Sequence, residues 1–253
     1  TYTYITAKFN IAFSSDISIC LCLYVFGHNK HKHILISLLN AILNFPKDKQ
    51  IVSVTILNPL NFKEKLDDKF SILDIKANDD AGRQYNIEMQ VNPEPEYIAR
   101  VMYYIDKLFI EQLKESSGYD KLNKTISISI LDFNLLLKEK NLHNIYRYKN
   151  IKSGKELTDI KEIHFIELKK FNKDKPKELR TTFEKWLHIL KFGEQYQGDI
   201  ESMPEELKEE EVIVMAVKAM SSALADRRMR EIINQREKAI HDEITRLTYA
   251  RRE

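Results

Sequence analysis

The sequence predicts an α/β (α+β) layer fold, in which helices pack against a sheet. One observation is the helical spacing of apolar residues in segments 31–43 and 96–114. The other is the alternation typical of strands in segments 51–57, 70–77, 84–91, 125–133 and 163–168. Hydrophobic residues make up 43% and charged residues 31% of the 253 residues, which excludes an intrinsically disordered chain.

The first helix and the first strand have clear ends. One apolar face of the helix is formed by Ile34, Leu35, Leu38, Leu39, Ile42 and Leu43. Asn44 and Pro46 end this helix. Segment 51–57 is β-branched and alternating, and the Asn58-Pro59 pair ends it, which predicts a strand.

Segments 70–77 and 84–91 predict a hairpin joined by residues 78–83. A three-residue loop at 80–82, with Gly82 in the left-handed conformation, pairs Asp79 with Arg83. Counting back along both strands places Asp74 directly opposite Glu88 on one face of the sheet.

Two opposed carboxylates repel each other unless a cation lies between them. Oxygen ligands favour Mg²⁺, Mn²⁺ or Ca²⁺, and such an ion activates water and stabilises charge on a phosphoryl group. Lys76 and Gln90 share this face and would orient phosphate or water. The alternative is that these are solvated residues on an open sheet face.

The remaining segments complete the layers. The stripe predicted to be buried on helix 96–114 is Ile98, Val101, Met102, Ile105, Leu108 and Phe109.

Segment 169–180 has six basic and two acidic residues; a solvated loop is favoured over a contact with a DNA backbone. Segment 182–192 predicts a helix with the only Trp, Trp186, and segment 205–253 predicts one long helix or a helical hairpin.

Several classes of protein are excluded by composition. The net charge of +2 gives no global attraction to nucleic acid or membrane. Cys20 and Cys22 are too close for an ordinary disulfide, which suits a reducing compartment. The longest apolar run, residues 17–26, is shorter than the roughly 20 residues that a membrane span needs. We therefore expect a cytoplasmic protein with no membrane partner.

Two stretches, 68–77 and 82–90, resemble the Rpn family of recombination-promoting nucleases, also described as PD-(D/E)xK nuclease family transposases. Further matches follow in the family's order, at residues 26–27, 38–43, 56–59, 100–104 and 163–168. The resemblance covers about residues 26–200. It implies a nuclease-like domain at 1–200, with an extra N-terminal segment at about 14–25, and a helical C-terminal extension at 201–253.

The resemblance also implies an activity and its residues. The fold would be a restriction-endonuclease-like PD-(D/E)xK core with a mixed sheet flanked by helices. The activity would be Mg²⁺-dependent endonuclease cleavage of DNA phosphodiesters, with Mn²⁺ or Ca²⁺ as other candidate ions, associated with recombination or transposition. Asp74, Glu88 and Gln90 would be catalytic. Asp74, Glu88 and the backbone carbonyl of Met89 would hold the metal.

Other residues near this hairpin are candidates for DNA binding. They are Lys76, Arg83, Arg100 and Tyr104. Arg100 and Tyr104 are four apart on one helix and would face one ligand. The alternatives without DNA binding are that Arg83 is a structural turn residue and that Arg100 and Tyr104 form a pair on the surface.

The N-terminus departs from the family pattern. Asn10 stands where the family has an acid, and about ten extra residues follow Phe13 before Phe26. The alternative function is thus a degenerate mobile-element copy, catalytically weak or inactive, that acts as a DNA-binding or protein-interaction module. At the other end, Ile233, Ile240 and Leu247 form a stripe that would support a homodimer, although packing back onto the core is favoured.

Overall fold

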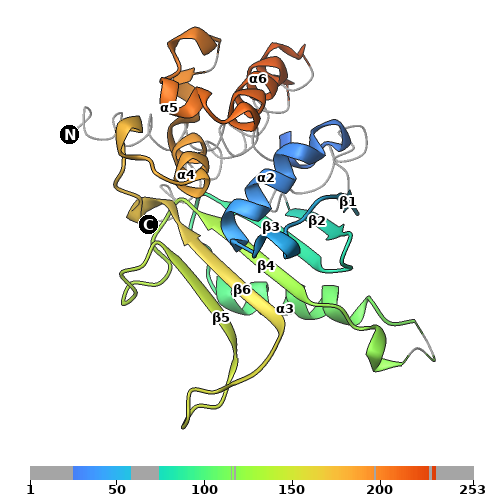
Figure 1. Cartoon of the computed structure of the whole chain (residues 1–253). Helices are drawn as coiled ribbons and strands as arrows, with labels where there is room; N and C mark the ends of the chain where they lie inside the picture. The colour runs from blue at the N-terminus through green and yellow to red at the C-terminus, as the bar shows by residue number, and fades with distance from the viewer. Residues whose placement is uncertain are drawn as a thin grey trace, which may run out of the picture.

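The computed structural model describes residues 25–57, 74–114, 116, 118–196, 198–227 and 230–231. Within these residues a mixed six-stranded sheet has the order β1-β2-β3-β4-β6-β5 (Figure 1). The strands are β1 (Val54–Ile56), β2 (Asp74–Asp79), β3 (Gln84–Gln90), β4 (Thr125–Leu131), β5 (His143–Lys149) and β6 (Glu156–Glu167). The strands β3, β4 and β6 are parallel, and the other neighbouring pairs are antiparallel.

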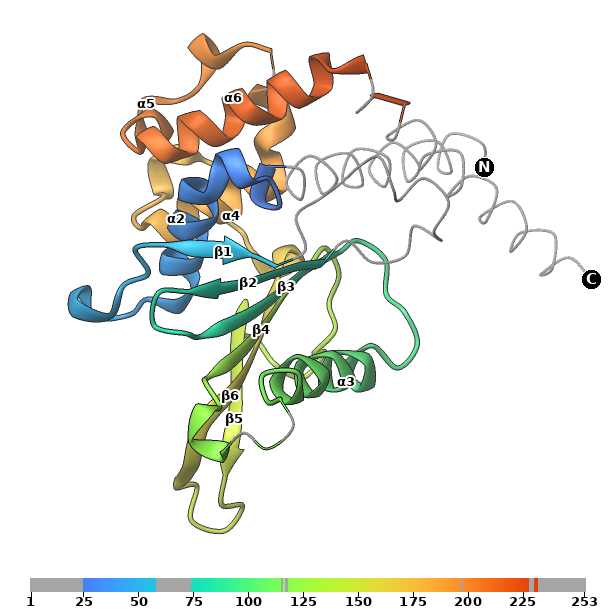
Figure 2. The ribbon, with the colours of Figure 1, turned by 90° about the vertical axis from the view of Figure 1, so that its right-hand side faces the viewer.

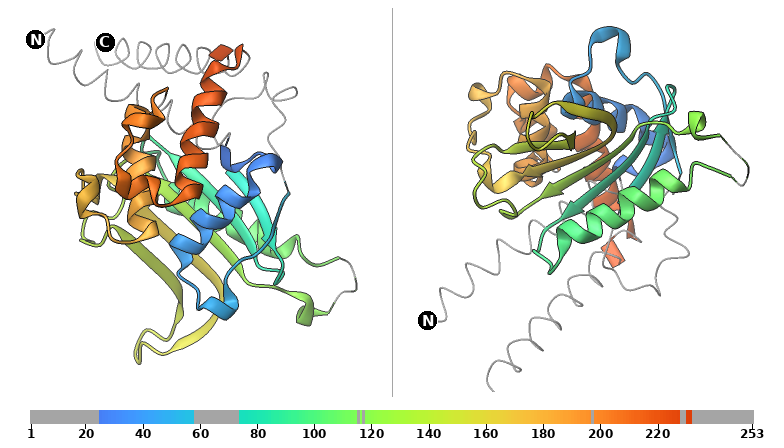
Figure 3. Two further views of the ribbon diagram at one scale, coloured as in Figure 1. Left: turned by 45° about the horizontal axis from the view of Figure 1, so that its top comes forward. Right: turned by 90° about the horizontal axis from the view of Figure 1, so that it is seen from below.

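Helices cover both faces of the sheet, which confirms the predicted fold class. They are α2 (Lys32–Leu43), α3 (Tyr97–Ile110), α4 (Thr182–Phe192), α5 (Glu205–Lys208) and α6 (Glu211–Ala225). In Figure 2, α3 lies on one side of the sheet, and α2, α4 and α6 lie on the other. Seen from below in Figure 3, α3 runs alongside the sheet.

The larger core lies between the sheet and the layer of α2, α4 and α6. Its buried members from the sheet include Ile87 and Ile128, and α4 contributes Trp186, which is fully buried. The Trp186 Nε1 donates a hydrogen bond to Ser37 Oγ on α2 at 3.1 Å. Since Ala216 and Met220 of α6 belong to the same core, residues beyond 200 pack with the sheet.

A smaller core lies between the sheet and α3. It consists of Tyr97, Val101, Leu131, Phe133 and Phe165. The buried stripe of α3 is therefore Tyr97, Val101, Ile105 and Leu108. The prediction that Ile98 and Met102 are buried is wrong, because Tyr97 takes the inward position and turns Ile98 and Met102 outward, with 48% and 37% of their surfaces exposed.

The predicted hairpin geometry is confirmed. The amide of Asp79 donates to the Arg83 carbonyl at 3.0 Å, and Gly82 has φ of 79° in the left-handed region. A side chain at Gly82 would be strained by this φ, and its Cβ would lie 3.0 Å from Oδ1 of Asn123. The register that follows pairs Asp74 with Glu88.

The strand β5 was not predicted, and β6 is longer than the predicted 163–168. The strand β5 is at the edge of the sheet, and most of its residues are exposed, so it lacks the apolar alternation that marks a half-buried strand. Residues 156–160 of β6 are likewise largely exposed and lie outside the pairing with β4, which begins at Lys161.

The segment that follows residue 204 is not one continuous helix. Helix α5 ends at Lys208, and Glu210 is extended before α6 begins. This break lets Glu210 accept a hydrogen bond from Thr182 Oγ1 at 2.9 Å and places its carboxylate 3.7 Å from Lys185. The predicted dimer stripe, the N-terminal insertion and Asn10 lie outside the described residues.

In the part of the chain that the structure describes, no helix is both long enough and apolar enough to cross a bilayer.

Candidate active site

The predicted carboxylate pair lies at the end of the β2–β3 hairpin remote from its turn. Strand β2 begins at Asp74, and its register partner on β3 is Glu88. Directly opposed positions in an antiparallel pair share one face. On the other side of β3, Glu88 aligns with Ser129 of the parallel strand β4. Only 2% of the Glu88 surface is exposed, so this is an acid held in the interior beneath α3.

A chain of polar contacts links Glu88 to Gln90 through α3. Nη2 of Arg100 donates to Oε1 of Glu88 at 2.6 Å, and Nη1 donates to Oε2 of Glu94. Oε1 of Glu94 accepts from Nε2 of Gln90 at 2.7 Å. The same amide donates to the carbonyl of Asn92 at 3.1 Å. The structure thus brings together Glu88, Gln90 and Arg100, which were three of the predicted site residues.

Sequence reasoning missed Glu94 and Tyr97. Glu94 is in the connection between β3 and α3, and its position four residues after Gln90 was the available signal. The Tyr97 ring lies under the guanidinium of Arg100, whose central carbon is 4.9 Å from the ring centroid. Burial, and then the nearby Glu88 carboxylate, raise the pKa of the Tyr97 hydroxyl, so this hydroxyl stays protonated beside the acid.

The other predicted site residues lie in different places. Lys76 aligns with Asn86, one pair further along the face that carries Glu88. The side chain of Met89 is in the larger core, which leaves only its backbone for a metal ligand. Tyr104 packs against Tyr103, with ring centroids 5.5 Å apart.

Arg83 is at the turn, at the opposite end of β2 and β3 from Glu88. Its Nε lies 2.5 Å from Oδ2 of Asp79, and both of its Nη atoms donate to the Lys49 carbonyl at 3.2 Å. Its guanidinium also stacks on the Phe45 ring, at 4.3 Å from the centroid. These contacts give Arg83 a structural role in the turn, and its predicted contact with DNA stays a prediction.

The residues at this site suit a hard cation in their chemistry. Two acids and a backbone carbonyl are oxygen donors of the kind that Mg²⁺, Mn²⁺ and Ca²⁺ prefer. Next to Glu88 on the same face of β3, the buried Oδ1 of Asn86 has no hydrogen-bond partner among the described residues, so it can accept from a bound water. Among the described side chains, no three His, Cys, Asp or Glu residues form a ready-made metal cluster.

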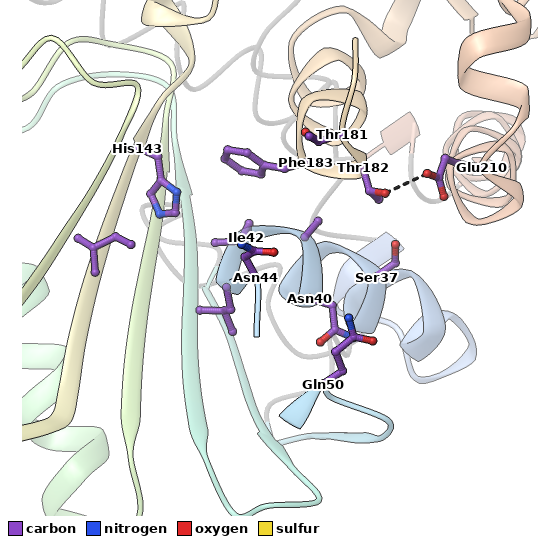
Figure 4. A pocket seen from close by; sticks show the side chains of 13 residues that line it. Ser37, Asn40, Ile42, Asn44, Gln50, His143, Thr181, Thr182, Phe183 and Glu210 are labelled. Carbon is purple, nitrogen blue, oxygen red and sulfur yellow. Dashed lines mark hydrogen bonds between the residues drawn. The ribbon is translucent and has the colours of Figure 1, made fainter. Parts of the chain in front are cut away.

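A second polar region lies on the other face of the sheet. An open pocket of about 890 Å³ is lined by α2, the beginning of α4 and strand β5, with His143 and Phe183 in its wall (Figure 4). Nε2 of His143 lies 2.8 Å from Nδ1 of His164, and Nε2 of His164 lies 2.6 Å from Oε1 of Glu162. Glu162 also accepts from Lys124 at 3.0 Å.

Burial and neighbouring charges shift the pKa values of Glu162 and His143. Burial alone would raise the pKa of Glu162, but the contacts with His164 and Lys124 outweigh it and lower the pKa to about 2. Burial and then the neighbouring His164 lower the pKa of His143 to about 4. When His164 is neutral and its Nε2 proton faces the ionised Glu162, Nδ1 of His164 accepts from Nε2 of His143, and Nδ1 of a neutral His143 is left as an acceptor.

The lowered pKa of His143 makes stability depend on pH. The ordinary pKa of a histidine is 6.5, so between pH 6.5 and about 4 the unfolded chain binds more protons here than the folded chain. Stability must therefore fall as the pH is lowered through this window. We expect His143→Gln, which does not titrate, to reduce the loss of melting temperature between pH 7 and 4.5. Identical pH profiles for the two proteins would contradict this assignment.

The chain matches a family model described as PD-(D/E)XK nuclease family transposase over residues 23–250. This match confirms the resemblance to PD-(D/E)xK transposases, and it extends past residue 200 into the C-terminal segment. No curated protein and no solved structure matches the chain.

Proposed function

The chain belongs to the PD-(D/E)XK nuclease family transposases, and from this premise we propose that it is a metal-dependent DNA endonuclease. Asp74, Glu88 and the Met89 carbonyl hold one divalent cation, with Mg²⁺ as the first candidate. The observation that supports this best is the register of Asp74 with the buried Glu88 at one end of the hairpin. A buried Glu88 with a second acid at the directly opposed position is unfavourable unless positive charge lies beside it.

The residues around the pair have separate tasks. A divalent cation, when bound, lowers the pKa of a water and stabilises charge on the phosphoryl group. Asp74 and Glu88 would bind that cation, and the Tyr97 ring lies against the guanidinium of Arg100, which contacts Glu88. Nε2 of Gln90 is already donating to Glu94 and Asn92, so Oε1 is the amide atom that accepts a hydrogen bond from the attacking water. Gln90 thereby orients the water and takes no proton from it.

DNA would approach along the exposed side of this site. Lys76 is on the same face and would contact a phosphate near the bond that is cut. Arg100 is held between two carboxylates, so it would reach DNA only after it leaves one of them. A contact through Tyr104 would come from the same helix, one turn further along.

The alternative function is a degenerate mobile-element copy that binds DNA or protein without cutting. Its sequence basis, Asn10 and the insertion after Phe13, lies outside the described residues. The geometry of Glu88 and Gln90 favours the active enzyme, because both side chains are buried and oriented by hydrogen bonds.

Nicking of supercoiled plasmid tests the proposed function. We expect the wild-type protein to nick DNA with Mg²⁺ or Mn²⁺, to be inactive in EDTA, and to lose activity in Asp74→Ala. Inactivity of the wild type under every condition would favour the degenerate copy. Equal nicking by both proteins would place the chemistry somewhere other than Asp74.

A further inference from the structure

Arg100 joins the innermost acid of the site to an outer one. One Nη atom of Arg100 contacts Glu88, of which 2% is exposed, and the other contacts Glu94, whose side chain is 36% exposed. The guanidinium rests on the Tyr97 ring. Its third nitrogen, Nε, is buried and has no hydrogen-bond partner among the described residues. Both Nη atoms of Arg100 are thus held by carboxylates, whereas its Nε lacks a hydrogen-bond acceptor among the described residues.

The contact with Glu88 has an electrostatic reason. A buried carboxylate without a partner is costly, and Arg100 supplies positive charge at 2.6 Å. A divalent cation bound at Glu88 would also supply positive charge. It would repel a guanidinium that contacts the same carboxylate, because like charges so near each other repel strongly even at an effective dielectric of about 20. The cation and Arg100 therefore compete for Glu88.

Glu94 gives Arg100 a place to remain when it leaves Glu88. Its carboxylate already holds the other Nη atom, and the planar guanidinium can turn on the Tyr97 ring without losing that contact. The same carboxylate holds the amide of Gln90. Glu94 can thus hold the released arginine and the water-orienting amide at once.

We propose that Arg100 is the built-in counter-ion of Glu88, which the divalent cation displaces, and that Glu94 is a positioning residue that retains the released guanidinium. This inference rests on the proposed function, since it concerns the same cation. Glu94 then assists metal binding without being a metal ligand. Arg100 weakens metal binding in the absence of DNA.

Calorimetric titration with Mn²⁺ alone, without DNA, tests this inference. We expect Arg100→Gln to bind Mn²⁺ at least roughly tenfold more tightly than the wild type, because a repelling charge is removed. We expect Glu94→Gln to bind Mn²⁺ more weakly, and to lose most of this effect when Arg100→Gln is also present. Glu96→Gln, at an exposed position in the same connection, measures the effect of removing one negative charge.

The outcomes separate this inference from the proposed function. Mn²⁺ binding that requires Asp74 but is unchanged or weakened by Arg100→Gln overturns the inference and leaves the metal site in place. If Glu94→Gln weakens Mn²⁺ binding equally with and without Arg100, then Glu94 is itself a metal ligand, and the inference is overturned. Failure of the wild type to bind Mn²⁺ overturns both. If Arg100→Gln does not fold, Arg100→Lys replaces it; its single ammonium cannot bridge two acids, so the effect of Glu94→Gln should shrink to that of Glu96→Gln.

Discussion

Asp74→Asn and Glu88→Gln are each expected to lower the rate of plasmid nicking by at least roughly 10³-fold. A bound cation stabilises the charge of the transition state by several kcal/mol, and each 1.36 kcal/mol corresponds to a tenfold change in rate. Both substitutions keep the size of the side chain and remove the charge that holds the cation. The measurement is the initial rate of nicking in Mg²⁺, with melting curves to show that both variants fold.

The double variant sharpens this prediction. Because the two acids hold one cation, removing the second after the first should cost little more, so the double variant should nick DNA at about the rate of either single variant. Glu111→Gln, at an exposed position beyond the end of α3, is the matched control and should retain the wild-type rate. Losses that multiply in the double variant would show that Asp74 and Glu88 act independently.

Among the substitutions proposed, Asp79→Ala is expected to lower the free energy of unfolding most, by about 3–5 kcal/mol. The Asp79 side chain is fully buried and accepts from the amides of Ala81 and Arg83. It also accepts from Nε of Arg83 at 2.5 Å and from the hydroxyl of Tyr85 at 2.7 Å. Its removal leaves the buried Tyr85 hydroxyl and Nε of Arg83 without their acceptor.

Urea unfolding followed by the fluorescence of Trp186 measures this loss. Trp186 is the only tryptophan and is fully buried in the larger core, so its emission reports global unfolding. Asp120→Ala removes an acid whose side chain is 71% exposed and should leave the midpoint close to that of the wild type. A change below about 1 kcal/mol for Asp79→Ala would contradict the structural role given to this turn.

The hairpin was the part of the site most accessible to prediction. Its register depends on local chemistry, namely the left-handed Gly82 and the pairing of Asp79 with Arg83, both of which can be read from the order of residues. Once the loop length is known, the alternation of faces places Asp74 opposite Glu88 without any knowledge of the rest of the chain.

The contacts made by α3 could not be predicted in the same way. Which face of α3 is buried depends on how the helix sits on the sheet, and the choice of Tyr97 over Ile98 follows from packing against Phe133 and Phe165. The pairing of Arg100 with Glu88 depends on that same rotation. The prediction of Arg100 as a DNA contact depended on its spacing from Tyr104 on one helix, which does not reveal the acid beside it. The DNA contact itself stays a prediction.

The edge strand β5 could not be predicted from the sequence for a different reason. Strand β5 is held by backbone pairing with β6, and its exposed residues give no periodic signal. Consequently the approach of His143 to His164, which are 21 residues apart, could not be seen before the two strands were placed side by side.

Anomalous diffraction from crystals grown with Mn²⁺ tests the central claim most directly. We predict one strong peak within about 2.0–2.6 Å of carboxylate oxygens of both Asp74 and Glu88 and of the Met89 carbonyl, as expected for oxygen ligands of such ions. The peak should be lost in crystals of Asp74→Asn. A peak elsewhere in the chain, or a peak that persists in Asp74→Asn, would contradict the assignment of this pair as the metal site.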